Sequence, residues 1–202
     1  MTLLSLIKLV HLLGLIMGFG GAILADILIL RGAILNPIEN KTIQAVRSLS
    51  HIVFIGLALL WLSGIILVGI RVSADPNVWM NQKIWAKVII VSILTVNGIF
   101  VHNIALRRLV TRHSQKMFSI SRPYELAGLS LVAAISSVSW IVPFVLGVAT
   151  EFNFTVRAVG ILAVYTILIL AGWATFFAIA YMSARIDRVQ KLRARQGGSQ
   201  LH

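Results

Sequence analysis

The stretch KLVHLLGLIMGFGGAILAD, residues 8–26, is almost entirely apolar residues and glycine, yet it contains a lysine, a histidine and an aspartate. On a helical wheel of about 100° per residue, Lys8, His11 and Asp26 fall within about 60° of one line. Small residues share this side of the helix: Gly14, Gly18, Ala22 and Ala25. Because a charged group that faces lipid costs several kcal/mol, we expect this side to face protein or a cofactor. Close helix packing through the GxxxG pattern is the alternative.

The whole chain is as apolar as this stretch. Of its 202 residues 58% are hydrophobic and none is cysteine, and the mean hydropathy is +0.93. A bilayer core of roughly 30 Å needs about 20 apolar residues per helix, and alternation typical of strands is absent. We therefore predict an all-α integral membrane bundle of five transmembrane helices. The predicted spans are Leu3–Leu30, His51–Ile70, Ile84–Leu106, Leu126–Ala149 and Val156–Met182.

The formal charge of +12 comes from basic residues that lie between the apolar runs, so it indicates topology and lipid contact, not nucleic-acid binding. Thirteen of the eighteen Lys and Arg fall in the connections after the first and third spans and in the tail. By the positive-inside rule these segments are cytoplasmic, which predicts an outside amino terminus and a cytoplasmic carboxyl terminus. We expect a transmembrane domain over residues 1–184 and a basic cytoplasmic tail over 185–202.

The predicted third helix repeats the pattern of the first. Lys87, Gly98 and His102 lie within about 60° of one line, and Asn97 is a further polar group inside the span. The predicted helix directions then give two polar layers. The outer layer contains Lys8, His11 and Lys87, and the inner layer contains Asp26, His51 and His102.

Each layer predicts a different chemistry. Two histidines on neighbouring helices, His51 and His102, could ligate haem b with glycines such as Gly98 and Gly18 making space for the ring. An exposed, solvated His51 is the alternative. The outer layer has two lysines beside His11 and no carboxylate, so it could bind an anionic guest such as haem propionates. Snorkelling of Lys8 and Lys87 to the interface is the alternative there.

The K-x-x-H-x-x-G start of the first helix (Lys8, His11, Gly14) and the W-x-K start of the third (Trp85, Lys87) resemble the small membrane proteins grouped around copper-resistance protein D and the haem-associated protoporphyrinogen oxidase HemJ. This resemblance implies a haem or metal role, with His11 and Lys87 as the functional positions.

Three functions remain open on the sequence. The leading hypothesis is a haem-b-binding membrane redox protein, with His11, His51 and His102 as candidate iron ligands and a redox partner or quinone as electron partner. A copper or small-solute permease is the second, and a non-catalytic membrane assembly protein is the third. The chain has no GxSxG, HExxH or P-loop motif. We expect a bacterial inner membrane location, contacts with lipid, and oligomers through glycine-rich helix faces.

Overall fold

The computed structural model describes residues 2–34, 40–101 and 123–198. Within these ranges the chain is helical and has no strand, which confirms the all-α prediction. Five of the described helices are long and apolar enough to cross a membrane. They are α1 (Leu3–Ile34), α2 (Asn40–Ala74), α3 (Gln82–Phe100), α5 (Pro123–Val148) and α6 (Ala158–Gly198).

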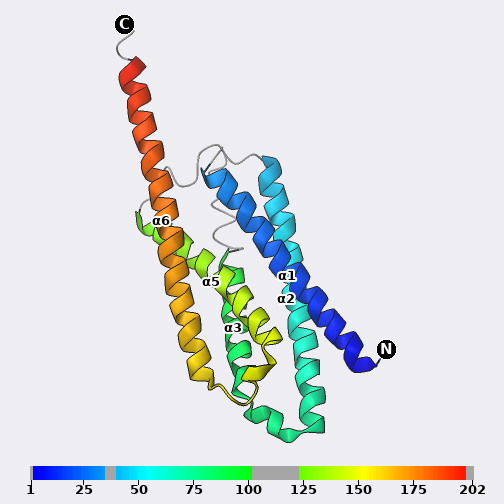
Figure 1. The fold of residues 1–202 in the computed structure, drawn as a ribbon. Helices are drawn as coiled ribbons and strands as arrows, with labels where there is room; N and C mark the ends of the chain where they lie inside the picture. The colour runs from blue at the N-terminus through cyan, green and yellow to red at the C-terminus, as the bar shows by residue number, and fades with distance from the viewer. Residues whose placement is uncertain (1, 35–39, 102–122, 199–202) are drawn as a thin grey trace.

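Two short 3-10 helices lie between the long ones, η1 (Pro76–Met80) after α2 and η3 (Thr150–Phe152) after α5. Both lie at the same end of the bundle, which we call the η1 end (Figure 1). Helix α1 begins near this end, and α6 runs to the opposite end of the bundle (Figure 1).

Helices α2 and α6 extend well beyond the predicted apolar spans, although α6 begins at Ala158, two residues after the predicted start. Helix α2 begins at Asn40, well before the predicted start at His51. Its first turns contain both polar and apolar residues, so a search for apolar runs does not detect them. These turns still place Ile43 and Val46 against the protein, at the helical spacing of three residues. Helix α6 likewise continues through residue 184 to Gly198, so the expected tail is a direct extension of the last span.

Most of the apolar surface of the long helices points outward. Leu12 and Ile16 on α1 are 53% and 66% exposed, and Leu62 and Ile65 on α2 are 62% and 64% exposed. Contiguous apolar surface of this extent is unfavourable in water but is matched by lipid tails, while the helices satisfy their own backbone groups. The protein is an integral membrane protein.

The bundle consists of two groups of helices. Helix α1 packs along α2, whereas α3 and α6 both pack against α5. One cluster of buried side chains joins the two groups, formed by Ala22, Leu57, Leu94 and Trp140. A second cluster lies within the α3, α5 and α6 group, formed by Ala86, Ile90, Leu146, Ile161 and Tyr165.

Glycine allows α1 and α2 to approach closely. A Cβ atom on Gly56 would lie 2.5 Å from the backbone nitrogen of Gly18 and 2.7 Å from the carbonyl oxygen of Gly14. No side chain fits between two backbones at these distances. The GxxxG pattern of α1 is therefore used for packing inside the bundle. By contrast, a Cβ atom on Gly20 would meet no neighbouring atom within 4 Å, and association of copies through such open glycines stays a prediction.

Candidate functional site

His11 lies on α1 against α2, where it meets a serine. Its Nδ1 atom is 2.8 Å from the hydroxyl oxygen of Ser63. Ser63 is only 2% exposed, and its hydroxyl also donates to the carbonyl oxygen of Leu59 at 2.5 Å. Gly64 leaves room beside the ring, because a Cβ there would lie 3.6 Å from His11 Cε1. The imidazole is thus held by one nitrogen on a small-residue surface of α2.

The second ring nitrogen of His11 is left for another partner. Among the described residues, no hydrogen bond reaches Nε2, and no buried side-chain nitrogen or oxygen lacks a partner. Nε2 is therefore not enclosed by protein atoms. A histidine fixed at Nδ1 and open at Nε2 has the arrangement of most metal-ligating histidines.

Lys87 on α3 belongs to the same part of the bundle. Its ammonium group interacts electrostatically with His11, and it lies 3.9 Å from the position of a Cβ on Gly147. Within the part of the chain that the structure describes, its Nζ has no hydrogen-bond partner, and it is not enclosed. The predicted pair of His11 and Lys87 thus lies within electrostatic range, with no hydrogen bond between the two side chains among the described residues.

Further positive charge surrounds Lys87 at the η1 end. Lys83 and Arg71 both act on its ammonium group. Lys83 is 4% exposed and donates to the carbonyl oxygen of Ala149, just after the end of α5. Glu151 is the carboxylate that acts on Lys83. Three cations and one carboxylate leave a positive excess, which favours an anionic guest.

The other predicted site residues have different surroundings. Lys8, Asp26 and His51 are exposed on their helices, and His102 lies outside the described residues. Exposure of His51 agrees with the solvated alternative.

Three predicted site residues remain: Asn97, Gly18 and Gly98. Contacts between helices account for the first two. Asn97 is buried and donates to the carbonyl oxygen of Val132, so it links α3 to α5. A Cβ on Gly18 would lie 2.2 Å from the ring of Trp140, which fills the space beside this glycine. Among the described residues, no atom lies within 4 Å of the position of a Cβ on Gly98.

Sequence reasoning missed Ser63 and Lys83. Ser63 lies about 120° from His51 on the wheel of α2, so it is not on the same side of this helix as that predicted ligand. Its contact with His11 depends on the register between α1 and α2. The SG pair at residues 63–64 inside an apolar run was the available signal.

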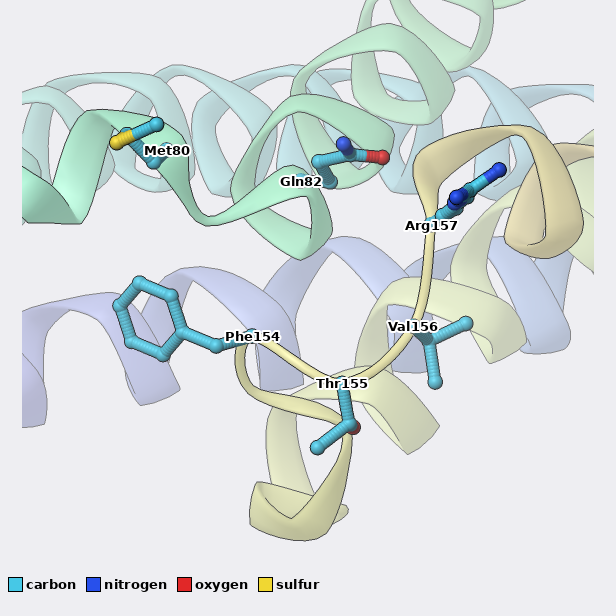
Figure 2. Close-up of a pocket in the computed structure, with 6 residues that line it drawn as sticks. All are labelled: Met80, Gln82, Phe154, Thr155, Val156 and Arg157. Atoms are coloured by element: carbon cyan, nitrogen blue, oxygen red, sulfur yellow. The ribbon is translucent and has the colours of Figure 1, made fainter.

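A separate pocket of about 240 Å³ lies at the η1 end. Figure 2 shows Met80 and Phe154 toward one side of it and Gln82 and Arg157 toward the other. None of the predicted site residues lines this pocket. The His11 and Lys87 pair is therefore the stronger candidate site.

Comparison with models of known protein families, with curated proteins and with solved structures finds no match to this chain. The class that the fold defines is an all-helical integral membrane protein with five helices of spanning length among its described residues.

Proposed function

We propose that this protein is a haem-b-binding integral membrane redox protein in which His11 ligates the iron. The observation that carries the proposal is the hydrogen bond between His11 Nδ1 and Ser63, which leaves Nε2 open. A second hydrogen bond that orients the ligand is what iron- and zinc-binding histidines ordinarily have.

The donor set favours haem over a bare metal ion. Zinc sites use three or four protein donors, and the described residues include no group of three or more His, Asp or Glu that could hold an ion. Haem supplies four nitrogens of its own and needs one or two protein ligands. A single well-oriented histidine is therefore sufficient for haem.

The charges near His11 fit the second feature of haem, its propionates. Lys87 has no hydrogen-bond partner among the described residues and is repelled by Lys83 and Arg71. A carboxylate beside Lys87 would offset this repulsion and form a charge-assisted hydrogen bond. Lys87 would thus hold the anionic edge of the group while His11 holds its centre.

The resemblance of Lys8, His11, Gly14, Trp85 and Lys87 to the HemJ group supports the same pair of residues. When bound, haem iron supplies one-electron transfer. The chain's own residues orient it, neutralise its charge and separate it from water. A bacterial inner membrane location with the η1 end outside is part of this proposal, and its support is the distribution of basic residues.

The proposal is tested by the absorbance of the detergent-purified protein with added haem. We expect a Soret band in the wild type and its loss in His11→Ala, whereas His51→Ala should keep it as a matched control. Lys87→Met should weaken haem affinity about tenfold because a charge-assisted bond is lost. Lys8→Met, a change at an exposed lysine, should alter affinity little.

Other outcomes assign other functions. A Soret band that depends on His51 and His102 but not on His11 would move the haem to the inner pair of histidines. No Soret band in any variant would leave the permease and the assembly protein, and metal content with copper sensitivity of cells would separate these two.

A further inference from the structure

We infer that Ser63 is the positioning residue for His11: its hydroxyl holds the imidazole as the Nδ1–H tautomer and so presents Nε2 as a free base. The tautomer follows from the contacts of this chain alone. Its consequence for haem rests on the proposed function.

The first step is the direction of the Ser63 proton. A hydroxyl has one proton to donate and two lone pairs to accept with. Ser63 Oγ is hydrogen-bonded to the carbonyl oxygen of Leu59, and a carbonyl oxygen can only accept. The Ser63 hydroxyl therefore donates its proton to the Leu59 carbonyl, and it can only accept a hydrogen bond from His11 Nδ1–H.

The same direction is found for other helix hydroxyls of this protein. Each donates to the carbonyl four residues earlier, a common habit of Ser and Thr in apolar helices. The residues that do so are Ser73, Ser92, Thr95, Ser137, Thr166 and Thr175. Ser63 thus follows a local rule of the chain.

Thr95 provides a direct precedent for the second bond. Its hydroxyl donates to the carbonyl oxygen of Val91 at 2.7 Å and accepts from the indole Nε1–H of Trp61 at 3.1 Å. An indole nitrogen can only donate, so here the direction is unambiguous. His11 relates to Ser63 as Trp61 relates to Thr95, with a ring N–H from one helix donating to a back-bonded hydroxyl on another.

The consequence is a specific ring orientation. Because Nδ1–H donates to the buried hydroxyl, the lone pair of the ring is on Nε2, the ring nitrogen that makes no hydrogen bond in the described residues. Without the Ser63 hydroxyl, Nδ1–H would lose the hydrogen-bond partner that it has in this structure. The ring would then be free to rotate or to change tautomer.

The test is ¹⁵N NMR of histidine-labelled, haem-free full-length protein at about pH 8, where an ordinary histidine is neutral. The signals of His11 are identified by their loss in His11→Ala. We expect the Nδ1–H tautomer in the wild type and in Ser63→Thr, which keeps the hydroxyl. Ser63→Ala should lose the predominance of this tautomer. Ser92→Ala should not, because the Ser92 hydroxyl bonds to the carbonyl oxygen of Val88 and has no second partner among the described residues.

The inference is overturned if wild-type His11 is the Nε2–H tautomer, or if Ser63→Ala leaves the Nδ1–H pattern unchanged. The wild-type measurement decides even if Ser63→Ala fails to fold. Haem titration of the same samples separates this inference from the proposed function. If His11 is the Nδ1–H tautomer but no haem binds, the role of Ser63 is supported and the haem site is contradicted. If haem binds and His11 of the haem-free protein is the Nε2–H tautomer, the haem site is supported and the role of Ser63 is contradicted.

Discussion

At the residue scale, Gly56 is a position that leaves no space for a larger side chain. Its Cα faces the backbone of Gly14 and Gly18 so closely that an added methyl group would overlap with backbone atoms, which cannot move aside as side chains do. We predict that Gly56→Ala destabilises the bundle by about 1–3 kcal/mol, the usual cost of overpacking. The measurement is thermal or SDS-induced unfolding in detergent micelles.

Gly69 on the same helix is the matched control. A Cβ atom there would meet no neighbouring atom within 4 Å, so Gly69→Ala should leave stability unchanged or raise it slightly through helix propensity. Equal losses in the two variants would contradict the close approach of α1 and α2.

Helical phase predicted from sequence that His11 and Lys87 lie on small-residue faces, because the 3.6-residue period needs no tertiary knowledge. Ser63 and Trp140 could not be predicted as partners. Which residue meets Gly18 or His11 depends on how α1 and α2 are shifted along each other, and hydropathy does not report this shift.

At the element scale, α2 and α3 are joined by the bond from Trp61 to Thr95 across the boundary between the two helix groups. We predict that Trp61→Phe and Thr95→Val each destabilise the protein, with a coupling of about 1 kcal/mol in a double-mutant cycle, the typical net value of one hydrogen bond. Unfolding in mixed micelles provides the four free energies.

Thr175→Val on α6 is the control, since among the described residues the Thr175 hydroxyl bonds to Ala171 of its own helix and to no other helix. It should show no coupling to Trp61→Phe. Additive effects of the Trp61 and Thr95 changes would mean that this bond does not hold α2 against α3.

The presence of five spanning helices could be predicted well, because a run of about twenty apolar residues is typical of a transmembrane helix and of few other structures. Their ends could not, because a helix can continue beyond the lipid core with polar residues, as α2 does from Asn40 and α6 does to Gly198.

At the scale of the whole molecule, the distribution of basic residues predicts a direction in the membrane. The chain contains no cysteine, so a single introduced cysteine can be labelled without background. A membrane-impermeant maleimide should label Asn77→Cys at the η1 end in intact cells, and it should label Ser114→Cys only after the cells are opened. The reverse pattern would contradict the assignment of His11 and Lys87 to the outer half.

The central claim is that His11 ligates haem through a ring nitrogen, and chemical rescue tests it most directly. His11→Gly removes the ligand and leaves a space beside Gly64 and Ser63 that free imidazole can occupy. The account predicts that this variant lacks the Soret band of the wild type and that added imidazole restores it, because iron regains its axial nitrogen. A Soret band that is unchanged in His11→Gly without imidazole would contradict the claim.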